Sequence, residues 1–283
     1  RLLARWIIDG RPDCDVSGIN VNRFHNCQRN PKYREDRLVE VLGKMYEPHF
    51  PNLGMSKARN VKQSVLHERL LKAGAHFNES AGWEIADWYA TDGKPGVVER
   101  YSWGRQNWFA DHEAEHHAAR NDVVLMDMSF MSKFLVQGND ACKVLNQICC
   151  NEIDVEDGRI VYTQWTNKAG GLEADLTVTR LARNEYMVIA SDTTHGHVKM
   201  WMDRNIPKDS HAFVTDVTSS YTQLNIHGPK SRELLKTLTS VDVSNEAFPY
   251  LSSQYIDIDY ASVLAIRVTY VGELGWELYI PSE

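Results

Sequence analysis

Two spacings of apolar residues alternate along this chain, and each predicts a different element. Between residues 34 and 46 the apolar side chains recur at the spacing of an amphipathic helix. They are Leu38, Val41, Leu42 and Met45. In residues 167–181, NKAGGLEADLTVTRL, apolar residues are interleaved with threonines behind a pair of glycines. That pattern predicts a turn followed by a strand.

The same patterns predict most of the remaining elements. Helices are expected over residues 1–9, 34–46, 64–73, 111–121, 139–150, 193–206 and 228–239. Strands are expected over residues 123–128, 132–138, 159–167, 176–181, 185–191, 211–218 and 221–228, with a strand–turn–strand unit from residue 263 onward. Ser64 is the expected N-cap of its helix, and Pro229 falls in the first turn of the last helix. The Trp-rich residues 80–109 are expected to form loops. Hairpins with interspersed helices indicate the α+β class, with a domain boundary near residue 110.

Composition and charge exclude several classes of protein. The chain has 283 residues, of which 43% are hydrophobic, enough for a sizeable core in one or two domains. Its net charge of -7 argues against nucleic acid as a partner, because phosphate binding favours a basic face. No apolar run approaches the roughly 20 residues that a membrane-spanning helix needs. The five cysteines form no CxxC pair, so we expect a reducing compartment and packed thiols rather than disulfides.

Three polar motifs invite a chemical interpretation, and the residues alone leave each open. Asp175, just before the strand at 176–181, is either a solvated turn acid or a functional carboxylate. His112-Glu-Ala-Glu-His116 matches the HExxH zinc pattern, but its helix is polar nearly all round, which favours a solvated helix and no metal site. The SDTT segment at residues 191–194 offers backbone donors at a helix start, which suits either a polar ligand or a plain cap.

Several motifs in fixed order resemble the sarcosine and dimethylglycine dehydrogenases, a family that includes the regulatory subunit of pyruvate dehydrogenase phosphatase. WIIDGRPDCDVSGINVNRF is similar to the tail of their FAD-dependent oxidoreductase domain, and LHERLLKAGAHFNESAGWEIADWY to their central domain. Four further motifs are similar to their folate-binding domain: YTQWTNKAGGLEADLTVTRL, LNIHGPKSRELL, VSNEAFPYL and VTYVGELGWELYIP. That domain in turn resembles the aminomethyltransferase of the glycine cleavage system. The resemblance implies domains at 1–25 (oxidoreductase tail), 26–109 (central domain) and 110–283 (truncated folate-binding domain), and hence an internal fragment.

The resemblance also implies chemistry for particular residues. The family's flavin oxidises an N-methyl amine to an iminium ion, and tetrahydrofolate captures the one-carbon unit. Asp175 matches the family's folate-domain aspartate, the expected catalytic group, and Tyr162 a tyrosine that lines the folate pocket. Ser191 lies where the aminomethyltransferases carry a pterin-binding asparagine. Glu273 and Glu277 are both candidates to pair with the pterin N–H edge, and the sequence does not choose between them.

The implied cofactors and partners follow from the same resemblance. FAD is expected to be bound mainly by a part of the protein before residue 1, and tetrahydrofolate by the folate-binding domain. The implied partners are an N-methyl amine substrate, folate and an electron acceptor such as an electron-transfer flavoprotein. The expected location is the mitochondrial matrix in a eukaryote and the cytoplasm in a bacterium. By itself the fragment is expected to be inactive.

Two other functions compete with the dehydrogenase. A non-catalytic regulatory subunit of pyruvate dehydrogenase phosphatase shares the architecture, and IPKDSHAFVTDVTSSYTQLN also resembles that protein. A stand-alone aminomethyltransferase is weaker, because residues 1–105 have no place in it. In the leading interpretation, Asp175 and Tyr162 face one central pocket, and Glu173 is a solvated turn acid.

Overall fold

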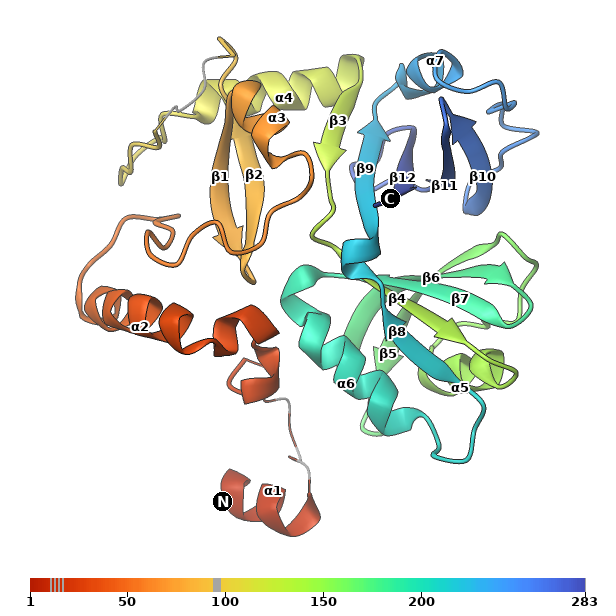
Figure 1. Ribbon diagram of the computed structural model, residues 1–283, viewed down its shortest axis with the longest axis horizontal. Coiled ribbons are helices and arrows are strands. Elements are labelled where there is room, and N and C mark those ends of the chain that lie inside the picture. Colours follow the sequence, from red (N-terminus) through yellow and green to blue (C-terminus); the bar gives the residue numbers. More distant parts are fainter. Residues whose placement is uncertain (11, 13, 15, 17, 94–97, 283) are drawn as a thin grey trace.

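The computed structural model describes residues 1–10, 12, 14, 16, 18–93 and 98–282, and it has the expected α+β composition (Figure 1). The helices are α1 (Leu2–Asp9), α2 (Pro31–Tyr46), α3 (His67–Lys72), α4 (Phe109–Asn121), α5 (Ala141–Ile148), α6 (His195–Asn205) and α7 (Ser231–Lys236), with short 3-10 helices η1 (Val21–Arg23), η2 (Asn26–Arg29), η3 (Asp192–Thr194) and η4 (Thr218–Ser220). The strands are β1 (Ala75–Ser80), β2 (Trp83–Tyr89), β3 (Val124–Asp127), β4 (Ser132–Gln137), β5 (Ile160–Thr166), β6 (Leu172–Ala182), β7 (Glu185–Ala190), β8 (Phe213–Asp216), β9 (Tyr221–His227), β10 (Ser252–Ile258), β11 (Ala261–Arg267) and β12 (Gly275–Pro281).

Two five-stranded antiparallel sheets form the C-terminal part. Their strand orders are β10-β11-β12-β9-β3 and β5-β6-β7-β4-β8. Strand β3 enters the first sheet and β4 the second, so the short connection between them links the two sheets (Figure 1). Strand β8 belongs to the second sheet and β9 to the first, so the segment between them returns the chain from the second sheet to the first. The chain therefore passes twice between the sheets, and residues of both crossings lie where the sheets meet.

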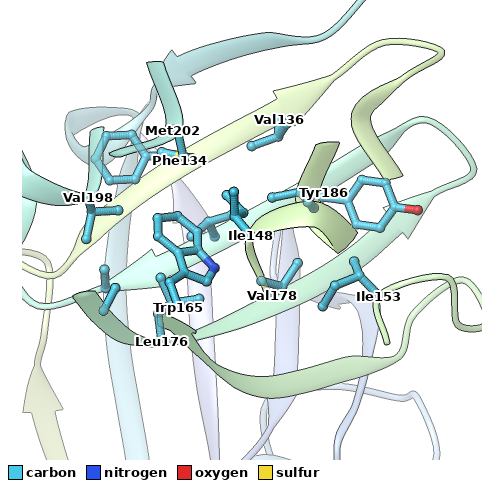
Figure 2. Close-up of a cluster of buried hydrophobic side chains, with 14 of the residues drawn as sticks. Phe134, Val136, Ile148, Ile153, Trp165, Leu176, Val178, Tyr186, Val198 and Met202 are labelled. Atoms are coloured by element: carbon cyan, nitrogen blue, oxygen red, sulfur yellow. The ribbon is translucent and has the colours of Figure 1, made fainter. Parts of the chain in front are cut away.

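Three apolar clusters hold this part together. The largest fills the space between the second sheet and helices α5 and α6, with Trp165 and Phe134 fully buried at its centre (Figure 2). A second cluster packs α7 against the first sheet. The third joins the sheets and consists of Ile160, Met187, Ile189, Leu264, Ile266 and Tyr279. Since burying one such side chain stabilises the fold by roughly 1.5–3 kcal/mol, this last cluster fixes one sheet against the other.

The N-terminal part is smaller and more loosely packed. Helix α2 begins at Pro31, earlier than expected, because Asn30 caps it by accepting the backbone N–H of Lys32 at 2.9 Å. Neither α1 nor α2 contains a fully buried residue, and α1 lies apart from the rest of the protein (Figure 1). Strands β1 and β2 form a two-stranded antiparallel sheet beside α3 and α4. No helix among the described residues is both long and apolar enough to cross a membrane.

Three local predictions are wrong. The expected helix over 64–73 starts only at His67, and the hydroxyl of Ser64 accepts the backbone N–H of Leu66 at 3.2 Å and donates to Asp127 in the turn ahead of it. The Trp-rich residues contain a strand, β2, whose Trp83 and Trp88 are buried, so part of this stretch is sheet rather than loop. Helix α7 begins two residues after Pro229. In these three places the local sequence pattern does not decide where the element begins or which type of element forms.

The close approach of β12 to β9 requires a glycine at position 275. A Cβ on Gly275 would lie 2.6 Å from the carbonyl oxygen of Ile226 and against the ring of the buried His227. The carbonyl belongs to the paired strand and has no freedom to move away. Gly43, on α2, has open space around it instead.

We expect Gly275→Ala to destabilise the protein by about 2 kcal/mol or more, since overpacking a core costs about 1–3 kcal/mol. Gly43→Ala is the matched control, and we expect it to be neutral or stabilising by up to about 1 kcal/mol, because alanine favours a helix interior over glycine. Urea unfolding followed by circular dichroism measures both. Equal stability of the two variants would show that the strands are not this closely packed.

Candidate active site

A cavity of about 610 Å³ opens between the two sheets. Strand β6 lines one side and strands β9 and β12 the other, while the β3–β4 connection and the start of η3 close the ends. Its lining residues are Met128, Met131, Tyr162, Leu172, Glu173, Ala174, Asp175, Leu176, Thr177, Ile189, Ala190, Ser191, Thr193, Thr194, Gln223, Asn225, Tyr270 and Glu277. The apolar walls with a few convergent polar groups are typical of a small-molecule site.

Asp175 faces this cavity because of the alternation along β6. Ala174 and Leu176 point into the core and are buried, so Asp175 between them points to the opposite face. Its carboxylate accepts a hydrogen bond from the hydroxyl of Tyr162 at 2.9 Å and another from the amide of Gln164 at 2.9 Å. Both donors lie on the neighbouring strand β5, where Gln164 is directly opposite Asp175. The carboxylate is exposed, held in position, and bonded only to neutral groups.

Glu277 lies on the opposite side of the cavity, on β12. Its carboxylate accepts the hydroxyl of Tyr279 at 2.6 Å and the amide of Asn225 at 3.3 Å. Burial raises the pKa of Glu277, while these two hydrogen bonds and the nearby Lys133 ammonium oppose that shift. Each oxygen has accepted one hydrogen bond from the protein, so each keeps a lone pair for a ligand.

The structure separates the two glutamates that the sequence left open. Glu273 does not line the cavity, and its carboxylate forms an ion pair with Arg120 of α4. Glu277 lines the cavity together with Tyr162, Asp175 and Ser191. The hydroxyl of Ser191 donates to Asp192 at 3.2 Å and lies 2.9 Å from the hydroxyl of Thr193. Four of the five site residues expected from the sequence therefore meet in one cavity.

Glu173 is not a solvated turn acid, contrary to expectation. Its carboxylate accepts the side-chain amide of Asn167 at 2.8 Å and lies 3.0 Å from Nε2 of His197. The side chain of Glu173 is only 12% exposed. Asn167 also accepts the backbone N–H of Gly171, so this residue organises the turn ahead of β6. Glu173 joins that turn to α6, and its contact with His197 gives it a structural role.

Sequence reasoning missed several polar residues of the cavity. Gln223 and Asn225 flank the half-buried Leu224 on β9, and Lys133, which is buried beside the cavity residue Met131, is the second residue of β4. A polar residue at a core position of a strand was the signal available for all three. Tyr270, which is 74% exposed at the cavity, lies in the loop before β12 and gave no periodic signal.

His195 and His197 each have protein partners instead of forming a joint site. Nδ1 of His195 lies 3.0 Å from the hydroxyl of Ser132, and Nε2 lies 3.1 Å from Asp216. His197 pairs with Glu173, as described above. Among the described residues, no group of three His, Cys, Asp or Glu side chains is arranged to hold a metal ion. These histidines instead connect α6 to the sheet beneath it.

Comparisons with known proteins identify the family and the fold. A model of the GCVT N-terminal domain matches residues 66–283, and a model of the FAD dependent oxidoreductase central domain matches residues 9–64. A solved aminomethyltransferase T of the glycine cleavage system from Bartonella henselae has a similar fold, with a TM-score of 0.63 and 22% identity over 78% of this chain and 54% of that one.

Three curated relatives cover nearly the whole chain. The 4-methylaminobutanoate oxidase (formaldehyde-forming) of Paenarthrobacter nicotinovorans is 40% identical over 98% of this chain. The human mitochondrial sarcosine dehydrogenase is 31% identical over 99%, and the mouse pyruvate dehydrogenase phosphatase regulatory subunit is 30% identical over 100%. The chain spans only about a third of their length, with 33%, 34% and 33% of each relative covered.

The hydrogen bond between Tyr162 and Asp175 makes a prediction about titration. It is the main cause that raises the pKa of Tyr162, because the neighbouring carboxylate opposes loss of the phenolic proton. We expect Asp175→Asn to lower the pKa of Tyr162 relative to the wild type. We expect Glu173→Gln, the matched control, to leave it unchanged, because Glu173 pairs with His197. NMR titration of the tyrosine ring carbons measures both, and an identical Tyr162 pKa in Asp175→Asn would rule out the contact.

Proposed function

The chain belongs to the family of the GCVT N-terminal domain, preceded by the FAD dependent oxidoreductase central domain, and we propose that it is part of an FAD- and tetrahydrofolate-dependent dehydrogenase. The proposed reaction is oxidative demethylation of an N-methyl amine, such as sarcosine or dimethylglycine, with transfer of the one-carbon unit to tetrahydrofolate. The central observation is that Asp175 and Glu277 face one cavity from opposite sheets.

The proposed mechanism assigns the oxidation to FAD, which would take a hydride equivalent from the N-methyl group and leave an iminium ion. The described residues act in the second step. Asp175 accepts the proton that the attacking folate nitrogen loses as its new bond to the iminium carbon forms, and its negative charge stabilises the cation. Asp175 then returns this proton to the amine nitrogen, the C–N bond breaks, and the demethylated amine leaves with its electron pair. The second folate nitrogen attacks the methylene carbon left on the first nitrogen and loses its own proton to Asp175, which completes 5,10-methylenetetrahydrofolate.

The other cavity residues orient the folate in this proposal. Glu277 accepts two N–H groups from the pterin edge, because an ionised carboxylate pairs well with adjacent donors. Tyr162 fixes the direction of the Asp175 carboxylate, and Tyr270 offers an aromatic face at the cavity. Ser191, in the place of an asparagine, is a weaker contact because it has a single hydroxyl. Met128 and Met131 supply an apolar wall of the cavity.

The remaining parts of the proposal concern the complete protein. FAD would be held by residues outside this chain, and an electron-transfer flavoprotein would be the acceptor. Mitochondrial relatives are known from mammals and a related oxidase from a bacterium, so the matrix or the cytoplasm is the proposed location according to the host. Because one relative is named formaldehyde-forming, the fate of the one-carbon unit is the point that an experiment must decide.

The alternative is a regulatory subunit without dehydrogenase activity, favoured by the relative of that name. The two functions differ in a direct test. The complete natural protein either reduces an electron acceptor with sarcosine or dimethylglycine, or does not. Turnover with either amine supports the enzyme, and its absence with flavin bound supports the regulatory subunit.

We expect Asp175→Ala in the complete natural protein to leave amine oxidation within about twofold of the wild type. The yield of 5,10-methylenetetrahydrofolate should fall at least about 100-fold, with formaldehyde released instead, because a positioned general base contributes about 10²–10⁴-fold. Asp257→Ala, which removes an exposed carboxylate from β10, is the matched control and should change neither activity. Equal loss of oxidation and transfer in Asp175→Ala would contradict the role assigned to Asp175.

A further inference from the structure

A second cavity, of about 630 Å³, lies between the N-terminal part and α6, where η1 contacts that helix. Residues of the segment 24–29 and Lys62 form one wall, and residues of α6 together with Asp216, the last residue of β8, form the other. It shares no lining residue with the cavity that contains Asp175 and Glu277. A cavity of this volume suits a small organic molecule better than a single ion.

The two walls of this second cavity are in direct contact. The ring of His25 lies 4.9 Å from the ring of His195, measured between centroids, and the hydroxyl of Ser80 on β1 donates to Asp192 of η3 at 2.8 Å. The side chain of His25 also accepts the backbone N–H of Gln28. A ring nitrogen that accepts a hydrogen bond carries no proton, and burial lowers the pKa of His25 to about 4. His25 is therefore a neutral part of the wall.

Both acids of the second cavity already have partners in its wall. Asp203 forms an ion pair with Lys199, one turn earlier on α6, at 2.7 Å. Asp216 lies 3.1 Å from Nε2 of His195 and accepts the hydroxyl of Thr218 at 2.7 Å. The cavity has one more permanent cation than it has acids, because two further basic side chains line it. Its formal charge is therefore positive even when both histidines are neutral.

The two further basic side chains are Arg29 and Lys62. Among the residues that the structure describes, neither side chain has a hydrogen bond or an ion pair with a carboxylate. The ammonium of Lys62 lies 4.3 Å from the ring centroid of Trp83, and burial lowers the pKa of Lys62. Asp216 and Asp192 act on Lys62 through space, but neither is bonded to it. The half-buried ammonium has lost part of its water without gaining an acceptor, and an anion in the cavity would supply one.

We propose that the second cavity is a separate binding site for a small organic anion, whose carboxylate or phosphate group binds to Arg29 and Lys62. The guanidinium group of an arginine pairs with two oxygens of such a group at once, and the ammonium of a lysine adds a compact positive charge. Phe24 and Met200 line the same cavity and offer apolar surface to the rest of the ligand. This site does not depend on the folate chemistry proposed for the first cavity.

A purely structural role for Lys62 is the competing explanation, because its side chain lies over the buried Trp83. Two substitutions separate the roles. Lys62→Arg keeps a positive charge that can also stack on an aromatic ring, whereas Lys62→Gln keeps a polar side chain but has no charge. Loss of a packing contact affects a charged ligand and its neutral analogue alike. Loss of a binding charge weakens only the charged ligand.

The test measures binding of benzoate, phenyl phosphate and neutral benzamide to the complete natural protein by calorimetry at low ionic strength. We expect at least one of the two anions to bind with a Kd of about 1 mM or tighter, and benzamide about tenfold more weakly or worse. Lys62→Gln and Arg29→Gln should each weaken that anion about tenfold or more, because a charge-assisted hydrogen bond is lost. Lys62→Arg should stay within about threefold of the wild type.

Lys236→Gln is the matched control, since it removes an exposed lysine from α7, and it should leave the affinity unchanged. The anion that binds more tightly shows whether the site takes a carboxylate or a phosphate. Binding of neither anion, equal binding of benzamide, or wild-type affinity in Lys62→Gln would each overturn the proposal.

A second measurement covers the case in which a variant does not fold or the anion also binds elsewhere in the complete protein. Acetylation of lysines by an N-hydroxysuccinimide ester is followed in the wild type by peptide mass spectrometry, with and without the anion. At about ten times its Kd the anion occupies about 90% of its sites, so acetylation of Lys62 should slow about tenfold. Acetylation of Lys236 should keep its rate. An unchanged rate at Lys62 would place the anion elsewhere and overturn the proposal.

Discussion

The candidate site depends on the register of β6 against β5. Side chains alternate along a strand, so a slip by one residue would turn every side chain of β6 to the opposite face. In the observed register Leu176 and Val178 enter the core beneath Trp165, and Asp175 faces the cavity opposite Gln164. The same pairing that buries the apolar residues therefore also aims the carboxylate. Because the core fixes the register, the position of Asp175 is fixed by burial energy and not by its own hydrogen bonds.

The elements of the site were predictable to different degrees. The strand that carries Tyr162 follows from period-two patterning, whereas β6 begins at Leu172, ahead of the predicted start at residue 176, and so includes Asp175. The motif resemblance placed both residues at one cavity. The choice between Glu273 and Glu277 was not available from the sequence, because it depends on where α4 lies. Arg120 of α4 forms an ion pair with Glu273, although the two residues are more than 150 positions apart in the chain. This ion pair commits the Glu273 carboxylate to α4.

The cavity shows a conflict between stability and ligand binding. Gln223, Asn225 and Glu277 line the cavity between the sheets, at positions that apolar residues would fill with greater stability. The apolar cluster around Tyr279 lies directly beside them and holds the sheets together. That cluster offsets the cost of the polar network, so the junction can carry charged groups without separating. A ligand that bonds to Glu277 would recover part of the same cost, which makes occupancy of the cavity stabilising for the whole junction.

Two carboxylates of β6 line the cavity in different environments, and this difference decides their roles. Glu173 and Asp175 are two residues apart, with a register shift in the β5–β6 pairing at Glu173. Glu173 is bonded to a histidine that becomes a cation when protonated, so its charge is committed to holding α6. Asp175 is bonded to a phenol and an amide, which orient its carboxylate without neutralising its charge. A base that accepts a proton from a ligand must keep its charge available until the reaction, and only Asp175 meets that requirement on this strand.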